Sequence, residues 1–144
     1  PRFHASTPPR VHIDIDAIVA VESSGNAAAI GDGDRSRGLC QIGRAAWSEC
    51  VGRLGHGDDW RWDDDAFDPG INRVVANEYV NRRIPEMLKA YGLPDTEPMR
   101  LACYCWGIGN VRKAYERDRG IHNFPAQVIQ YIERYRQAKA KKSA

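Results

Sequence analysis

The side chain whose type and position best suit chemistry is Glu22, in a sequence of 144 residues. It falls at the expected C-terminal end of a short helix, just before a turn-rich segment that would form one wall of a cleft. Apolar walls disfavour an ionised carboxyl group, so its pKa rises until it holds a proton near neutral pH. Such an acid can protonate a leaving oxygen, as glycosidic bond cleavage requires. A glutamate near a helix end is by itself more often a solvated surface residue, so the hypothesis needs further support.

Two more carboxylates follow in the segment Gly31-Asp32-Gly33-Asp34. Asp32 or Asp34 is a possible second carboxylate, which would orient a water molecule for hydrolysis after Glu22 has acted as the acid. Aspartate next to glycine is also ordinary turn chemistry, because aspartate tolerates the left-handed backbone conformation that turns need. The sequence therefore leaves both interpretations of these two residues open.

The elements that must position Glu22 begin with a short helix, with Asp14 or Asp16 as its N-cap and Ile18 and Val19 among its apolar residues. Small apolar residues at 28–30 and the run at 39–42 flank the turn formers, which predicts a small β-hairpin or an irregular β lobe. A helix is expected over residues 44–54, followed by a polar loop over residues 55–69.

The second half of the sequence is expected to be helical. Asp68-Pro69 is typical of an N-cap followed by proline at the first helical position, opening a long amphipathic helix to about residue 90. Another helix starts at Glu97-Pro98, breaks near Gly107 and Gly109, and resumes at 111–116. Pro125 opens the last helix, so the elements together predict an α+β, predominantly helical domain.

Composition and charge restrict the class of protein. The chain is 42% hydrophobic and 28% charged with a net charge of +2, values typical of one folded globular domain. So small a charge gives no reason to expect nucleic acid as a partner. No apolar stretch approaches the roughly 20 residues that cross a bilayer. The chain begins at Pro1 rather than Met, so an export signal could have been removed.

The four cysteines lack the paired spacing of a zinc site. Cys103 and Cys105 would point to different sides of a helix, so they are not expected to pair with each other. Either of them could reach Cys40 or Cys50 to form a disulfide. The four histidines share no spacing that suggests a metal or a catalytic triad, and we expect neither metal nor cofactor.

Four short motifs in order carry a resemblance to a known family. They are Glu22-Ser23, Gly-Leu-Cys-Gln-Ile at residues 38–42, Cys-Tyr-Cys-Trp-Gly-Ile-Gly-Asn-Val at residues 103–111, and Pro125-Ala126-Gln127 with Tyr131-Ile132. The set resembles the catalytic domain of soluble-type lytic transglycosylases, glycoside hydrolase family 23 of the lysozyme superfamily. The resemblance spans about 110 residues. It implies a lysozyme-like fold with a small β-hairpin lobe over residues 13–140, between an extended lead-in at 1–12 and a basic tail at 141–144.

The resemblance implies a role for each matched residue. Glu22 would be the catalytic acid/base, and Ser23 would orient it through a hydrogen bond. Gln41 would line the cleft and bind sugar, since an amide offers donors and an acceptor without adding charge. The other expected substrate-binding or supporting residues are Tyr104, Asn110 and Tyr131, of which Tyr131 would place its hydroxyl near the catalytic carboxyl group.

The sequence departs from the family pattern at several positions. Cys40 stands where the family usually has Met, which exchanges one soft apolar residue for a smaller one. Cys105 replaces an Asn, Trp106 an Ala and Ile108 a Pro, so the cleft floor is altered and the substrate contacts of that Asn are in doubt. Gln127 replaces a Glu. Trp60, Trp62 and Trp106 are candidates for stacking on sugar rings, but a core or lid role suits each equally well.

The function implied by the resemblance is cleavage of peptidoglycan glycan strands between N-acetylmuramic acid and N-acetylglucosamine, with a 1,6-anhydro product. Such a domain would act as a monomer in the periplasm, outside the cell, or in a phage or secretion system. Three alternatives remain: a muramidase that uses Glu22 with Asp32 or Asp34, a catalytically idle glycan-binding domain, and an enzyme that cleaves chitin or chitosan.

Overall fold

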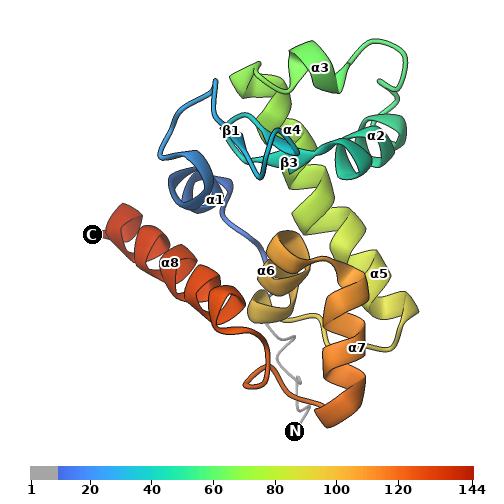
Figure 1. Ribbon diagram of the computed structural model, residues 1–144, viewed down its shortest axis with the longest axis vertical. Helices are drawn as coiled ribbons and strands as arrows, with labels where there is room; N and C mark the ends of the chain where they lie inside the picture. Colours follow the sequence, from blue (N-terminus) through green and yellow to red (C-terminus); the bar gives the residue numbers. More distant parts are fainter. Residues whose placement is uncertain (1–9) are drawn as a thin grey trace, which may run out of the picture.

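The computed structural model describes residues 10–144 and is predominantly helical, with one small sheet (Figure 1). The expected lead-in therefore lies outside the described residues up to position 9, and residues 10–12 are irregular. The predicted α+β class is confirmed. The strands are β1 (Ile30–Gly31), β2 (Ser36–Arg37) and β3 (Ile42–Gly43), and the helices are α1 (Ile15–Ser23), α2 (Arg44–Arg53), α3 (Trp62–Asp65), α4 (Pro69–Glu78), the π-helix η1 (Tyr79–Arg83), α5 (Ile84–Ala90), α6 (Glu97–Trp106), α7 (Ile108–Asp118) and α8 (Ala126–Ser143).

Helix α1 begins where the sequence predicts and places Glu22 in its last turn. Of the two candidate N-caps, Asp14 is the cap: its Oδ1 accepts hydrogen bonds from the backbone N–H groups of Asp16 at 2.9 Å and Ala17 at 3.4 Å. The helix ends at Ser24, whose φ of 53° is left-handed. Because α1 packs along α8, the end of α1 lies beside the C-terminal helix.

The β lobe contains one strand more than the hairpin that the sequence predicts. Strands β1, β2 and β3 form an antiparallel sheet in that order, with Ile30 opposite Arg37 and Arg37 opposite Ile42. The turn between β1 and β2 holds Asp32 and Asp34, with φ of 52° and 71°. These two aspartates thus adopt the left-handed conformation expected of turn formers.

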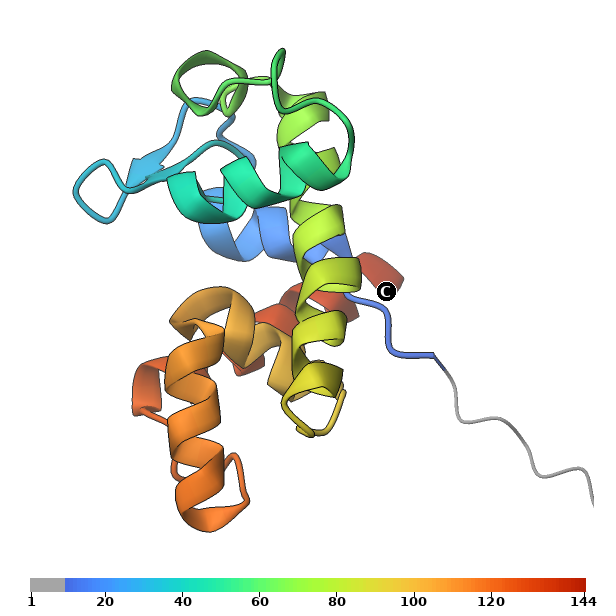
Figure 2. The same ribbon diagram turned by 90° about the vertical axis from the view of Figure 1, so that its right-hand side faces the viewer.

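A long helix runs through the molecule as three consecutive segments, α4, η1 and α5 (Figure 2). It starts as predicted, with Asp68 accepting a hydrogen bond from the N–H of Ile71 at 2.9 Å. In η1 the N–H of Ile84 donates to the carbonyl of Tyr79, five residues back. The next residue is Pro85, which has no N–H to continue the α-helical ladder, and this loss explains the wider turn.

Three of the predicted boundaries differ from the observed ones. The break after α6 lies at Gly107 alone, whose φ is 94°, and Gly109 is already inside α7. The expected polar loop contains α3, where Trp62 is buried and donates its indole N–H to the carbonyl of Ile42 at 2.9 Å. The expected tail at 141–143 is the last turn of α8, and Lys142 is ion-paired to two acidic residues at the start of α1, Asp14 and Asp16.

The core lies between α1, the long helix, α6 and α8, and its largest fully buried side chains include Trp47, Tyr135, Ile13, Ile18, Ile84, Leu88, Met99 and Leu101. All four cysteines are free thiols, so no disulfide forms among them. Cys40, Cys50 and Cys103 are buried and pack as small apolar residues. Cys105 is exposed.

Asn72 joins the β lobe to the long helix. Its side chain is fully buried, accepts a hydrogen bond from the N–H of Cys40 at 2.9 Å, and donates to the carbonyls of Ala66 at 2.8 Å and Arg37 at 3.1 Å. Gly38 passes so close that a Cβ on it would lie 2.3 Å from the Asn72 amide nitrogen. The amide therefore replaces the backbone partners that this irregular segment lacks.

We predict that Asn72→Ala lowers the free energy of unfolding by about 3 kcal/mol, because it removes the partner of two buried backbone groups, on Cys40 and Ala66, and of one partly buried group, on Arg37. Chemical denaturation followed by circular dichroism measures this. The matched control is Asn110→Ala, which removes an exposed amide bonded only to the carbonyl of Trp106 and should change stability by less than about 0.5 kcal/mol. Equal effects of the two substitutions would contradict the role of Asn72.

Candidate active site

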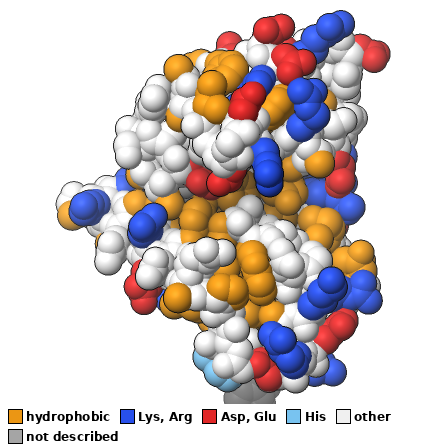
Figure 3. Space-filling model, viewed as in Figure 1, with side chains coloured by type: hydrophobic (Ala, Val, Ile, Leu, Met, Phe, Trp, Pro, Cys, Tyr) orange, Lys and Arg blue, Asp and Glu red, His pale blue; other side chains and the backbone are white. Residues whose placement is uncertain are grey.

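A cleft of about 440 Å³ separates the β lobe from the helices α6 and α8. Figure 3 shows it as a hollow across the middle of the molecule, with hydrophobic side chains along its floor. The β lobe and the first turn of α2 form one wall, and the helices form the other. The residues that line it are Glu22, Asp32, Ser36, Gln41, Ile42, Gly43, Arg44, Ala45, Ala46, Tyr79, Tyr104, Cys105 and Tyr131.

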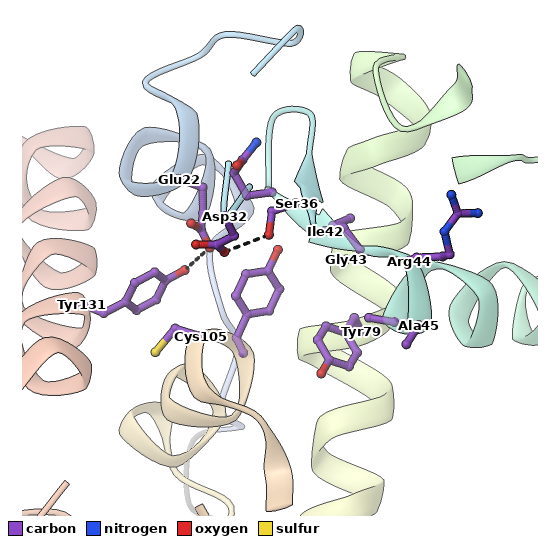
Figure 4. A pocket seen from close by; sticks show the side chains of 13 residues that line it. Glu22, Asp32, Ser36, Ile42, Gly43, Arg44, Ala45, Tyr79, Cys105 and Tyr131 are labelled. Carbon is purple, nitrogen blue, oxygen red and sulfur yellow. Dashed lines mark hydrogen bonds between the residues drawn. The ribbon is translucent and has the colours of Figure 1, made fainter. Parts of the chain in front are cut away.

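Glu22 is partly buried at one end of this cleft, at the end of α1 (Figure 4). The hydroxyl of Tyr131, which reaches in from α8, donates a hydrogen bond to Glu22 Oε2 at 3.1 Å. Loss of hydration raises the pKa of Glu22 from 4.5 to about 7; the bond from Tyr131 opposes this rise, and the negative charge of Asp32 adds to it. A carboxyl group with this pKa can both give and take a proton near neutral pH.

The two candidate second carboxylates lie in different places. Asp32 lines the cleft, and one of its oxygens accepts a hydrogen bond from the hydroxyl of Ser36 at 3.1 Å. Asp34 is not among the lining residues; its carboxylate accepts two hydrogen bonds from the guanidinium of Arg37, at 3.0 and 3.1 Å. Of the two, only Asp32 is thus available beside Glu22.

Gln41 lines the cleft, but its amide is already used within the β lobe. Its Nε2 donates to the carbonyls of Ala29 and Gly38, both at 3.0 Å, and its Oε1 lies against Gly31. The φ of Gln41 is 52°, a left-handed conformation that turns the chain into β3. The amide nitrogen of Gln41 thus shapes this wall of the cleft, and sugar binding by Gln41 stays a prediction.

Tyr104 and Tyr131 also line the cleft, and each hydroxyl has a definite partner. Tyr104 donates to the carbonyl of Cys40 at 2.6 Å, which ties α6 to the β lobe across the cleft. Burial raises the pKa of both phenols well above 10, so each hydroxyl stays protonated and acts as a donor. Tyr131 is thus the group that orients Glu22.

Two matched residues do not reach the cleft. The hydroxyl of Ser23 donates to the carbonyl of Val19 at 3.2 Å, within its own helix, so it does not make the expected bond to Glu22. Asn110 is exposed on α7 and donates to the carbonyl of Trp106. Neither of them lines the cleft, and their expected supporting roles stay predictions.

Two further side chains line the cleft: Tyr79, which the motifs do not indicate, and Cys105, which they place in the cleft floor. Tyr79, at the start of η1, lines the cleft with its ring 5.7 Å from that of Tyr104. Cys105 occupies the position where the resemblance predicts Asn, and its Sγ lies 3.8 Å from the carbonyl oxygen of Ala102. None of the three candidate tryptophans lines the cleft: Trp60 stacks on His56, Trp62 is buried, and Trp106 packs against Phe124, all within the described residues.

A helical domain with a small β lobe, and a cleft between them that ends at a partly buried carboxyl group on the first helix, defines a lysozyme-like fold. The sequence model of the transglycosylase SLT domain matches residues 12–124. The chain belongs to this family of peptidoglycan lytic transglycosylase domains. Searches of curated proteins and of solved structures found no significant match. The matched range ends before α8, which contributes Tyr131.

We predict that Asp32→Asn lowers the pKa of Glu22, because it removes a negative charge that disfavours ionisation of its carboxyl group. A titration followed by NMR of the Glu22 side-chain carboxyl carbon measures this. Asp34→Asn is the matched control and should leave the pKa in place, since Asp34 is paired with Arg37 outside the cleft. Equal shifts in the two variants would show that Asp32 has no special proximity to Glu22.

Proposed function

We propose that this domain is a lytic transglycosylase that cleaves the β-1,4 bond between N-acetylmuramic acid and N-acetylglucosamine in peptidoglycan. The observation that carries the proposal is Glu22, a cleft carboxyl group with a pKa of about 7 and a hydrogen bond from Tyr131. Membership of the transglycosylase SLT domain family supports this substrate class. The reaction needs one group that is first an acid and then a base, which this pKa allows.

In the first step, Glu22 donates its proton to the bridging oxygen as the glycosidic bond breaks. The acetamido group of the substrate itself attacks the anomeric carbon and stabilises its positive charge. Tyr131 donates a hydrogen bond to Glu22 Oε2, so it holds the carboxyl group in place and stabilises the carboxylate that forms. The nearby charge of Asp32 favours the protonated starting state and the cationic centre alike.

In the second step, Glu22 takes the proton from the C6 hydroxyl of the muramyl sugar. The C6 oxygen bonds to the anomeric carbon and displaces the acetamido oxygen, giving a 1,6-anhydro end without consuming water. Glu22 is then protonated again and ready for another cycle.

The second candidate function is hydrolysis, and Asp32 is the observation that favours it. Its carboxylate lines the same cleft as Glu22 and is held by Ser36, so it can orient a water molecule toward the anomeric carbon. Asp34 has no such part, because Arg37 binds it. The character of the product end separates hydrolysis from transglycosylation.

The substrate implies a site of action outside the cytoplasm, in the periplasm or beyond, or at the wall in a phage or secretion context. Among the described residues no helix is long and apolar enough to cross a membrane. We propose that the domain acts on glycan strands as a monomer.

The test is digestion of purified sacculi with the domain, followed by mass spectrometry of the released muropeptides. We expect anhydro ends, and Glu22→Gln should reduce release by about 100-fold or more, because glutamine cannot transfer a proton. Arg112→Gln, on the outer surface of α7, is the matched control and should retain activity.

Products one water heavier than the anhydro form would favour hydrolysis with Asp32. Unchanged release by the Glu22 variant would refute its catalytic role. A wild-type domain that binds sacculi without releasing any muropeptide would favour the idle glycan-binding domain. Cleavage of chitin oligomers but not of sacculi would favour a chitin-cleaving enzyme.

A further inference from the structure

A second cavity, of about 780 Å³, lies where the segment before α1 meets the long helix and α6. Its lining residues are Arg10, Val11, His12, Asn81, Arg82, Asp95 and Arg100. Tyr79 of η1 lines the catalytic cleft, whereas Asn81 and Arg82 of the same π-helix line this cavity. Figure 2 shows residues 10–14 and the β1–β2 turn on opposite sides of the long helix. The two hollows therefore open on different faces.

The cavity has more positive than negative groups. Arg100 is nearly fully buried and binds both carboxylate oxygens of Asp95, at 2.6 and 2.8 Å. Its Nη1 also donates to Asn81 Oδ1 at 3.1 Å. The single carboxylate in the lining, Asp95, is therefore neutralised by Arg100. The other basic side chains have no counter-charge within the cavity.

Arg82 and Arg10 supply the excess charge. Arg82 has its side chain 68% exposed, and its nearest carboxylate, Glu78, lies 3.5 Å away and also binds Arg53 at 3.2 Å. Glu78, which is not part of the cavity lining, thus forms ion pairs with two arginines. Arg10 makes no ion pair with any residue from 10 to 144. His12 also lines the cavity, with ring nitrogens that can form hydrogen bonds.

The backbone around these side chains is held in place. Asn81 Oδ1 accepts a hydrogen bond from the N–H of Ile13 at 2.8 Å, and Asn81 Nδ2 donates to the carbonyl of Ile13 at 2.9 Å. This pair of bonds fixes the segment that follows Arg10 and His12 against η1. A ligand would therefore meet backbone that is already held against η1, whereas the exposed side chains of Arg10 and Arg82 would become ordered on binding.

We propose that this cavity is a binding site for a phosphate group, whether free or part of an anionic polymer. Arginine presents a planar set of N–H donors that matches the oxygens of phosphate, and such charge-assisted hydrogen bonds are stronger than neutral ones. Arg10 comes from the segment before α1 and Arg82 from η1, and both line the cavity together with the Arg100–Asp95 pair. A site on this face leaves the catalytic cleft open.

The test is a titration of the whole chain with inorganic phosphate, followed by NMR of the backbone N–H of Ile13 and the guanidinium N–H groups. We expect saturable shifts confined to this cavity. The double variant Arg10→Gln with Arg82→Gln should weaken binding about tenfold, through the loss of two charge-assisted contacts. The matched control, Arg112→Gln with Arg134→Gln, removes the same charge from other surfaces and should bind phosphate as tightly as the wild type.

Shifts that do not saturate, or equal weakening in the control, would overturn the site. A parallel titration with poly(glycerol phosphate) distinguishes the sources: tighter binding per phosphate than the free ion identifies a polymer, and equal binding identifies the free ion. The measurement involves no glycan and no turnover. Its outcome is therefore independent of whether Glu22 cleaves peptidoglycan.

Discussion

The proposed activity depends on one electrostatic constraint on the carboxyl group at the end of α1. This group must be shielded from water enough to stay protonated near neutral pH, and it must also be accessible to a sugar chain. Glu22 meets both conditions at the wall of the cleft, where loss of hydration raises its pKa to about 7. Tyr131 stabilises the ionised form through its hydrogen bond, so the pKa does not rise further. The balance of these two effects gives an acid that can also serve as a base.

Three separate parts of the chain maintain that balance. Helix α1 carries Glu22 and begins at the Asp14 cap, which Lys142 at the far end of α8 also binds. Helix α8 brings Tyr131, and the β lobe closes the other wall. The β lobe in turn depends on Asn72 and on the bond from Tyr104 to Cys40, which join it to α4 and α6. Glu22 is thus positioned by contacts between residues far apart in the sequence.

Local signals explain why much of the fold is predictable. The Asp14 and Asp68 caps, the turn aspartates and Pro125 act within a few residues, so their patterns predict helix starts and the β turn correctly. The π-helix has a signal too, since Pro85 removes one N–H. No local sequence pattern indicates that Trp62 is buried. The polar residues around it are typical of a loop, and only tertiary packing covers its ring.

In the candidate site, too, local motifs predict some features, whereas others depend on the tertiary structure. Glu22, Tyr104 and Tyr131 lie where the motifs predict, but the partners of Gln41 and Ser23 cannot be derived from spacing. Gln41 bonds to the carbonyl of Ala29, twelve residues away, and Ser23 bonds back within its own helix. Asn72 could have been noticed as a polar residue beside Ile71 and Val75 on an otherwise apolar face, since a buried amide at such a position needs partners.

The most direct test is the pKa of Glu22 in the unmodified domain, measured by carbon NMR of its side-chain carboxyl group from pH 3 to 9. We predict a midpoint near 7, with the carboxyl group mostly protonated at pH 6, where an exposed glutamate is ionised. A midpoint near 4.5 would mean that the group is hydrated, and it would contradict a single residue acting as both acid and base.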